Sequence, residues 1–390
     1  MELELYFEFP ENFTITKNSG KNTIADCITL YNPTLLKRLA DYPIALIGIK
    51  DERNSNNSGV STSPDIVRQY LYKLYNHNNN CKILDLGNLI SGKTLDDTYL
   101  ALQEIVKFLL DNKITPVLFG SSQDMMYPIS KALKEIYSNI TISCIDSHID
   151  VGSKEELHNH SSLNFIDHKL NPHKIITIGS QSYLVSLTDF EYIEEKRHTN
   201  FRLGKIRDDF KKTEPLLRDS QFTTFDISAT RQCDAPGNSF TSPNGLTGEE
   251  SCQLAKYAGL SEKTKAFFVC EYTPKFDINE QTAHLVAQLL WHFIDGFYTR
   301  KNDYPNNSTE TLLKYVLNSD EFGTNFIFYK SSKTDRWWIE ITNDDDKSQS
   351  YLTPCNYEDY ISACQNAIPD IYLQEKSRLK ILHPIINKSY

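Results

Sequence analysis

The sequence predicts an α/β protein in which helices cover both faces of a mostly parallel sheet. Along residues 42–304, short apolar runs alternate with longer stretches of helical period, which is the pattern of strands joined by crossover helices. Most of these runs are continuously apolar, as is typical of strands that are buried on both faces. The pattern changes after about residue 302, so residues 305–390 are expected to form a small C-terminal α+β appendage.

Seven short runs rich in Ile, Val, Leu and Phe are expected to form the strands of the sheet. They are Ile44–Ile49, Cys81–Leu86, Pro116–Phe119, Ile140–Ile145, Lys174–Ile178, Thr223–Ile227 and Ala266–Glu271. Five segments of helical period accompany them, namely Pro64–Tyr75, Leu95–Asn112, Met125–Tyr137, Glu249–Gly259 and Gln281–Arg300. In the first helix Ser63 is a candidate cap, and Pro64 occupies the first turn, where proline is tolerated.

The chain is expected to divide into three regions. Residues 1–41 form an N-terminal extension, residues 42–304 form the α/β domain, and residues 305–390 form the appendage. Within the appendage, FIFYKSSKTDRWWIEI predicts a two-stranded hairpin that turns around Ser331–Asp335. The stretch Tyr357–Ala367 that follows is amphipathic.

The charge and composition of the chain argue against several classes of protein. With 41 basic and 51 acidic residues the formal net charge is −10, which disfavours a nucleic-acid partner. The start, MELELYFEFPENF, carries acids where a signal peptide carries basic residues, and no apolar run approaches the ~18–20 residues that span a bilayer. The eight cysteines form no CxxC pair and are expected to be reduced. We therefore expect a cytoplasmic protein without a membrane partner.

Polar residues follow four of the predicted strands, at the edge where open parallel sheets bind ligands. After Ile140–Ile145 come Asp146, His148 and Asp150, and an extended segment would place these three side chains on one side. Carboxylate with imidazole is a ligand set for manganese, iron or zinc. The other positions are Gln123 after the Gly120 turn, Asp226 with Ser228, and Glu271. A single acid at a strand end is most often a cap or turn former, but four positions in this order predict one shared site.

On these motifs the chain resembles the arginase, agmatinase and formimidoylglutamase family, the ureohydrolases, over about residues 42–300. The supporting segments are ALIGIKDERNSNNSGVSTSPDIVRQYL, DLGN at 85–88, the Gly120 turn, the Asp146 triplet and TFDISATRQCDAPGNSFTSPNGLT. The resemblance implies a three-layer arginase-like fold with a mostly parallel central sheet. It also implies two manganese ions, which lower the pKa of a bridging water so that this water attacks a guanidino or formimino carbon.

The resemblance further implies a role for each site residue. The implied metal ligands are Asp146, His148, Asp150 and Asp226, and the implied catalytic residues are Asp146 and His148. The implied substrate-binding residues are Glu271, His160, Ser161 and Ser162. Glu271 matches the family acid that receives the cationic amidine through charge-assisted hydrogen bonds. The run from Ser161 to Asn164 comes closest to the formimidoylglutamase pattern.

Two positions depart from the family pattern. Gln123 stands where the family has a histidine, and Ser228 stands where it has a second aspartate. The spacing from Asp226 to Pro236 reproduces that of the family without a gap, so the serine is a genuine substitution. The four aspartates and two histidines that hold the metal ions in the family are thereby reduced to three aspartates and one histidine. We expect manganese to bind weakly or sub-stoichiometrically, because two cations ~3.5–4 Å apart would be poorly compensated.

Neighbouring side chains offer replacements for the missing ligands. Asp124 adjoins Gln123, although an acid before a helical stretch is more often its cap. His158 and His160 could act as ligands or as a proton shuttle, although exposed loop histidines are more common. The loop DAPGNSFTSPNGLTGEE lines the site in the family, but its Pro and Gly residues support the fold more than the chemistry.

These observations leave three functions open. The favoured one is a family member that has lost the dinuclear centre, is impaired in or lacks amidine hydrolysis, and acts through ligand binding or protein assembly. The alternative is an active metal-dependent hydrolase of carbon–nitrogen bonds in linear amidines that uses an altered metal set. The third is an enzyme that uses a single metal ion for another hydrolytic reaction. A guanidino or formimino small molecule is the expected ligand, the appendage is a candidate contact for a protein partner, and the resemblance implies a homo-oligomer.

Overall fold

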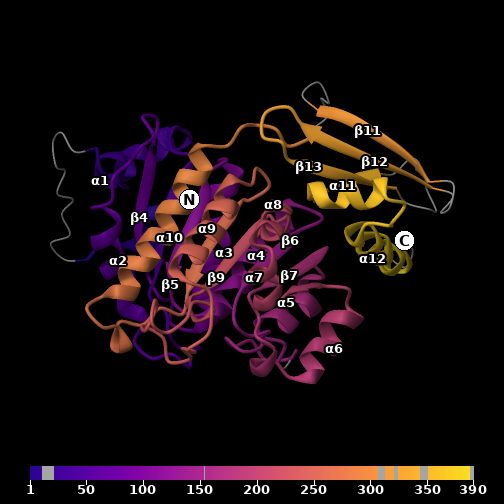
Figure 1. Cartoon of the computed structure of the whole chain (residues 1–390). Helices are drawn as coiled ribbons and strands as arrows, with labels where there is room; N and C mark the ends of the chain where they lie inside the picture. Colours follow the sequence, from indigo (N-terminus) through magenta and orange to yellow (C-terminus); the bar gives the residue numbers. More distant parts are fainter. Residues whose placement is uncertain (11–21, 153, 306–311, 320–323, 343–349, 387–390) are drawn as a thin grey trace. The chain divides into compact units, whose positions relative to one another are not determined.

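The computed structural model describes residues 1–10, 22–152, 154–305, 312–319, 324–342 and 350–386. The chain forms two units, which are drawn in Figure 1. The larger unit contains Met1–Glu194 and His198–Thr299, and the smaller unit contains Glu195–Arg197 and Arg300–Tyr390. Among the described residues, no helix is both long and apolar enough to cross a membrane.

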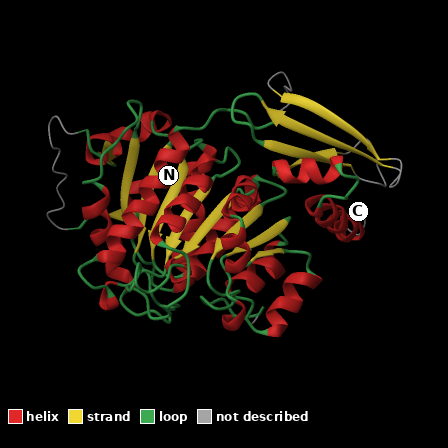
Figure 2. Ribbon diagram, viewed as in Figure 1, coloured by secondary structure: helices red, strands yellow, loops and turns green. Residues whose placement is uncertain are grey.

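Ten strands of the described residues form one sheet in the larger unit (Figure 2). Their order is β1-β4-β3-β5-β10-β9-β6-β7-β8, and β2 also pairs with β4. The pairs are parallel except for β1 with β4. The strands are β1 Phe7–Glu8, β2 Ile28–Leu30, β3 Ile44–Ile49, β4 Ile83–Leu89, β5 Thr115–Gly120, β6 Thr141–Ile145, β7 Lys174–Ile178, β8 Thr199–Phe201, β9 Phe222–Asp226 and β10 Ala266–Cys270.

Helices cover both faces of this sheet, which confirms the predicted three-layer α/β fold. One apolar core lies against α2 Ser63–Leu71, α7 Leu203–Asp208, α8 Thr213–Arg218, α9 Gly248–Leu260 and α10 Gln281–Tyr298. The core on the other face lies against α3 Leu95–Asp111, α4 Met126–Ile136, α5 Ser162–Leu170 and α6 Leu187–Glu195. Successive strand residues face opposite cores: Leu46 belongs to the first core, and Ala45 and Ile47 belong to the second.

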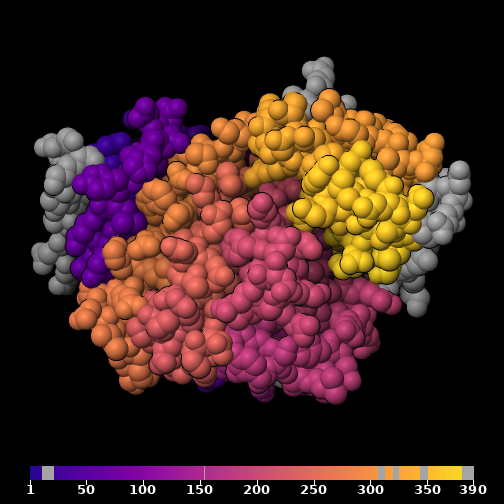
Figure 3. Space-filling view, in the orientation of Figure 1, coloured from indigo at the N-terminus to yellow at the C-terminus, as the bar shows by residue number. Residues whose placement is uncertain are grey.

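Several elements were not expected from the sequence. The N-terminal segment adds β1, the four-residue helix α1 Ile24–Cys27 and β2, so part of residues 1–41 joins the main sheet. Strand β8 and helices α5 to α8 are also additional. In the space-filling view, residues from about 150 to 230, which include α5 to α8, form one continuous area of the surface (Figure 3). Most of these elements are short, so an apolar period is hard to recognise in them.

The smaller unit contains an antiparallel sheet in the order β11-β12-β13-β14 with helices beside it. The elements are β11 Leu312–Ser319, β12 Thr324–Ser331, β13 Trp337–Thr342, β14 Ser350–Cys355, α11 Tyr357–Cys364 and α12 Asp370–Ile386. The predicted hairpin is β12 with β13, in which Phe328 pairs with Ile339. The amphipathic stretch forms α11, and its Tyr360 stacks on Trp337 with ring centroids 4.8 Å apart. The predicted α+β appendage is confirmed.

A buried ion pair joins helix α2 to strand β4. The side chains of Arg68 and Asp85 are 0% exposed, and Arg68 Nε donates to Asp85 Oδ2 at 2.9 Å. Arg68 also donates to the backbone oxygen of Gly87 at 2.7 Å, and its guanidinium lies over the ring of Phe119, 5.0 Å from the centroid. The guanidinium is therefore hydrogen-bonded within the protein in place of water, and it fixes helix α2, which follows the loop after β3.

Replacing Arg68 by methionine should lower the free energy of unfolding by ~3–5 kcal/mol, because Asp85 would remain as a buried carboxylate without its main partner. Urea unfolding followed by circular dichroism measures this loss. The control is Arg38→Met, which removes an exposed ion pair to Asp41 and should leave stability unchanged within error. Equal effects of the two variants would contradict the assigned role of Arg68.

Asp219 is held between two lysines near the start of the strands. It accepts from Lys174 at 2.6 Å and from Lys263 at 2.7 Å. Burial alone would raise the pKa of Asp219, but the two ammonium groups outweigh it and hold the pKa well below the ordinary value. This carboxylate therefore stabilises the fold at any pH at which it would also be ionised in the unfolded chain.

The stabilisation by Asp219 should disappear in acid. Because its pKa is lower in the folded chain than the ~3.9 of an unfolded aspartate, the advantage is complete well above pH ~4 and shrinks as the pH falls below that value. The difference in unfolding free energy between the wild type and Asp219→Asn should thus be constant near neutrality and decline below pH ~4. Urea unfolding across this pH range is the measurement, and a pH-independent difference would refute it.

Candidate functional site

The residues singled out from the sequence meet at the carboxyl ends of β5, β10, β9 and β6, which are neighbours in the sheet. Asp146 directly follows β6, Asp226 ends β9, Glu271 directly follows β10, and Gln123 lies three residues after β5. The cavity there is lined by Gln123, Asp146, His148, Asp150, Asn159, His160, Asp226, Ser228, Phe240 and Glu271. Eight of the ten were named from the sequence, and Asn159 and Phe240 are additional.

Asp146 is the centre of the hydrogen bonds in this cavity. Its Oδ2 accepts from the side-chain amide of Gln123 at 2.8 Å. Its Oδ1 accepts from the backbone N–H of His148 at 2.9 Å and from the hydroxyl of Ser228 at 3.4 Å. Gln123 and Ser228 therefore both donate to the same carboxylate.

Carboxyl groups crowd the buried interior of the cavity, and this disfavours the ionisation of most of them. Burial, followed by the charge of Asp146, raises the pKa of Asp150 well above its ordinary value. Burial and the charges of Asp146 and Glu271 do the same for Asp226. Burial also raises the pKa of Glu271 to about 7. Asp146 differs: burial opposes its ionisation, but its interactions with His148 lower its pKa overall. A cation that entered here would favour ionisation of every one of these groups.

Two histidines lie at the wall of the cavity. The carboxylate of Asp146, whose Oδ1 lies 3.8 Å from His148 Nδ1, raises the pKa of His148, and the same Nδ1 is 2.9 Å from the hydroxyl of Ser147. Burial lowers the pKa of His160, whose Nδ1 is 3.5 Å from Asp150 Oδ1. His158 does not line the cavity, and its Nδ1 accepts from the backbone N–H of His160 at 3.2 Å.

Glu271 is held in a left-handed backbone conformation, with φ of +65°, that residues other than glycine seldom adopt. The side chain is 2% exposed, and its Oε1 accepts from the backbone N–H of Gln123 at 3.0 Å. Its Oε2 accepts no hydrogen bond from the described residues. Because buried carboxylate oxygens normally have a partner, this oxygen is a ready acceptor for a donor brought by a ligand.

Two asparagines, Asn57 and Asn238, fix the backbone of Glu271. Its carbonyl accepts from Asn57 Nδ2 at 2.5 Å and from Asn238 Nδ2 at 2.8 Å. Asn57 is 0% exposed, and its Oδ1 accepts from the N–H of Ser239 at 3.1 Å and from its hydroxyl at 2.6 Å. Asn57 thereby ties the loop after β3 to the loops after β9 and β10. No spacing in the sequence indicates this role.

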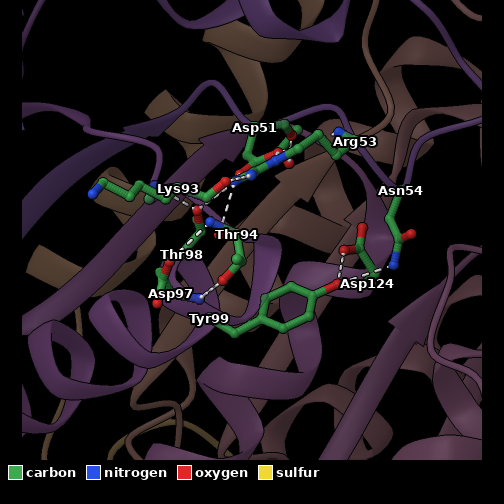
Figure 4. A network of polar contacts seen from close by, with 11 residues as sticks. Asp51, Arg53, Asn54, Lys93, Thr94, Asp97, Thr98, Tyr99 and Asp124 are labelled. Atoms are coloured by element: carbon green, nitrogen blue, oxygen red, sulfur yellow. Dashed lines mark hydrogen bonds and ion pairs between the residues drawn. The ribbon is translucent and has the colours of Figure 1, made fainter.

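The same loop after β3 belongs to a polar network that Figure 4 shows. Asp51 accepts from Arg53 and from the hydroxyl of Thr98, and Asn54 donates to Tyr99 Oη at 3.1 Å. The hydroxyl of Tyr99 in turn donates to Asp124.

Asp124 itself belongs to this network and not to the lining of the cavity. It is 0% exposed, it accepts from the hydroxyls of Ser122 and Tyr99, and burial raises its pKa to about 6. In this arrangement its carboxylate is bonded to Tyr99 of α3 and to Ser122.

Ser161 and Ser162 lie outside the lining of the cavity, although both were named as substrate-binding residues. Ser161 Oγ donates to the carbonyl of Glu156 at 2.5 Å and accepts from the N–H of His158 at 3.0 Å. Ser162 Oγ lies 3.5 Å from the carbonyl of Asn159. Both hydroxyls are buried and serve the turn that leads into α5.

The cavity is nearly closed by its own side chains. Its free volume is about 10 Å³, close to the ~10–15 Å³ that one water molecule needs. In the described part of the chain, no three His, Cys, Asp or Glu side chains are arranged around one point as the ligands of a metal ion are. Gln123 and Ser228 instead occupy the lone pairs of Asp146 with hydrogen bonds.

Replacing Asn57 by alanine should lower the free energy of unfolding by ~1–3 kcal/mol, because it leaves the buried backbone carbonyl of Glu271 with one partner fewer and unties this loop from Ser239. Thermal or urea unfolding measures the loss. The matched control is Asn56→Ala in the same loop, since Asn56 is exposed and makes one hydrogen bond to Asn159. If both variants unfold alike, Asn57 does not position the loops.

Comparison with known proteins places this chain in a family. The family model described as "Arginase family" matches residues 42–295. A formimidoylglutamase of Legionella pneumophila (strain Lens) is 25% identical over 266 residues, which cover 64% of this chain and 82% of the relative. One of Streptococcus gordonii is 23% identical over 292 residues, which cover 69% of this chain and 88% of the relative.

Solved structures share the fold. The formimidoylglutamase of Bacillus subtilis has a TM-score of 0.66 at 19% identity, covering 75% of this chain and 97% of its own. The formiminoglutamase of Trypanosoma cruzi with Mn2+ has a TM-score of 0.63 at 20% identity, covering 68% of this chain and 96% of its own. The chain is thus a member of the arginase family, and within it is similar to the formimidoylglutamases.

Proposed function

We propose that this protein binds a cationic guanidino or formimino compound in the cavity lined by Asp146, Asp150, Asp226 and Glu271, which we call the acidic cavity. In this proposal its dinuclear metal site is degenerate, and it lacks efficient amidine hydrolysis. The observation that carries the proposal is the hydrogen bond from the Gln123 amide to Asp146. An amide N–H is a donor, so it occupies a carboxylate lone pair that a metal ion would otherwise use.

The chemistry of the donor set also supports a loss of metal affinity. Three carboxylates and one imidazole, from Asp146, Asp150, Asp226 and His148, are the groups in the cavity that would hold manganese. Gln123 and Ser228 add only neutral groups. Changes in the outer partners of metal ligands already cost ~10–100-fold in affinity or activity, so the loss of a direct ligand from each ion should cost more. We judge these residues a poor fit to a pair of divalent ions.

The remaining acidic groups suit an organic cation. Glu271 offers a buried oxygen that accepts no hydrogen bond from the residues the structure describes, and Asp150 and Asp226 lie in the same cavity. An amidinium is planar and carries several N–H donors, which match a carboxylate by charge-assisted hydrogen bonds. Because the cavity as it stands is narrow, its side chains have to move apart to admit such a group. Relatives named formimidoylglutamase support this class of ligand.

A second candidate is an active metal-dependent hydrolase of linear amidines. It is favoured by the convergence of Asp146, His148, Asp150 and Asp226 on one cavity together with Glu271. Bound manganese would supply an activated water in such an enzyme. The side chains would hold the ion, and Glu271 would orient the amidine. The two candidates differ in metal content and in turnover.

Metal analysis and an activity assay distinguish them. Purified protein incubated with Mn2+ and then desalted should carry well under two ions per chain. It should release no urea, formamide or ammonia at useful rates from arginine, agmatine or formiminoglutamate. Calorimetric titration with these compounds should detect binding that Glu271→Gln weakens by about tenfold or more, since the charge-assisted contact is lost. Two tightly held ions with turnover would favour the hydrolase.

The double replacement Gln123→His with Ser228→Asp serves as the complementary test. It should raise manganese occupancy above that of either single variant, because each single variant restores one ligand only. If the double variant binds no more manganese than the wild type, the two substitutions are not the cause of the weak metal site.

A further inference from the structure

A second hollow, of about 500 Å³, lies in the larger unit beyond the ends of β7 and β8. We call it the basic pocket, and the basic and polar residues in its lining include Arg202, Lys205, Arg207, Ser180, Ser182 and Asn244. It shares no lining residue with the acidic cavity. Three cations thus face one hollow in a chain whose formal net charge is −10.

These cations are not neutralised by neighbouring carboxylates. Arg202 Nη1 donates to the hydroxyl of Ser182 at 3.0 Å, and Arg207 Nη2 donates to the carbonyl of Gly245 at 2.8 Å, so both contact neutral acceptors. In the part of the chain that the structure describes, none of the three cations has an ion pair. Asp208 is the single acid in the lining. Cations that converge on a concave surface raise the local potential and concentrate anions there.

The floor of the basic pocket is a set of fixed polar groups. Ser180 is 0% exposed, and its hydroxyl donates to Asn200 Oδ1 at 2.6 Å. Gln181 is 3% exposed, its Nε2 donates to the carbonyl of Asn244 at 3.1 Å, and its Oε1 accepts from the hydroxyl of Tyr183. The ring of Tyr183, 65% exposed, flanks the hollow. These internal hydrogen bonds hold the floor in place, and the donors that a carboxylate or phosphate would meet are those of Arg202, Lys205 and Arg207.

Space for a ligand is open beside Gly204. A Cβ placed on this residue meets no heavy atom within 4 Å, and Gly204 lines the basic pocket in helix α7. The backbone N–H of Gln181 donates to the carbonyl of Ser147 at 2.9 Å, and Ser147 stands in sequence between Asp146 and His148 of the acidic cavity.

We propose that the basic pocket is a binding site for a small organic anion that carries carboxylate or phosphate groups. The proposal is independent of the function proposed for the acidic cavity, since it rests on other residues and on charge of the opposite sign. The size of the hollow suits a compound larger than a bare inorganic ion, with its anionic groups at the cations and its remaining part against Tyr183.

The decisive variants change the charge of the basic pocket without disturbing the core. Gly204→Glu places a carboxylate in the open space among the cations, and Gly204→Ala is the matched control that adds only a methyl group. Both residues form helices better than glycine, so neither should impair folding. A second pair compares Lys205→Gln with Lys211→Gln, which removes an exposed cation outside the pocket.

Calorimetric titration of the full chain at constant ionic strength, with inorganic phosphate and with succinate as separate probes, tests the site. The wild type, Gly204→Ala and Lys211→Gln should bind at least one probe with one site per chain. Gly204→Glu and Lys205→Gln should weaken this binding, Gly204→Glu by about tenfold or more because it adds a like charge. Tighter binding of phosphate or of succinate identifies the class of anionic group.

Three results would overturn the proposal. The first is the absence of saturable binding of either probe at millimolar concentrations. The second is equal binding by Gly204→Glu and Gly204→Ala. The third is that the protein binds neither probe while Gly204→Glu changes the mass of its assembly, measured by light scattering. The cations of the basic pocket would then contact another copy of the chain. The variant Glu271→Gln should bind the two probes as the wild type does. The test of the basic pocket is thereby independent of the function proposed for the acidic cavity.

Discussion

Carboxyl groups crowded into one closed cavity are the constraint on which the arrangement of the site depends. Asp146, Asp150, Asp226 and Glu271 lie at the ends of adjacent strands, where water is almost excluded. Charges of one sign in such a place need compensation. The chain provides it by raising the pKa of three of the four groups and by directing neutral donors at the fourth.

Gln123 and Ser228 share one physical role in this cavity. In a metal site the lone pairs of the carboxylates point at cations, whereas here the amide of Gln123 and the hydroxyl of Ser228 approach Asp146. Both groups act as donors to this carboxylate. The side chains thus form a hydrogen-bonded cluster, in which Oε2 of Glu271 accepts no hydrogen bond from any residue that the structure describes.

The sequence predicts the parts of this molecule that have a strong local pattern. Strand Ile44–Ile49 is continuously apolar and strand Lys174–Ile178 is rich in isoleucine, and the predicted bounds of both agree with the structure. The convergence of Asp146, Asp226 and Glu271 is predictable because the carboxyl ends of parallel strands meet at one edge. Asn57 is not predictable, because its partners Ser239 and Glu271 are 182 and 214 residues away and a polar run has no period. The short strands β1 and β8 contain too few residues to show an alternation.

The carboxylate of Asp146, whose pKa is lowered, and the three cations of the basic pocket give this edge of the sheet an electric polarity. Strands β6, β7 and β8 are consecutive in the sheet, so this negative group at the end of the first lies beside the positive groups beyond the other two. A molecule with separated positive and negative ends experiences a torque in such a field before it makes any contact. Zwitterions therefore approach this edge with a preferred orientation, and dissolved salt weakens that preference.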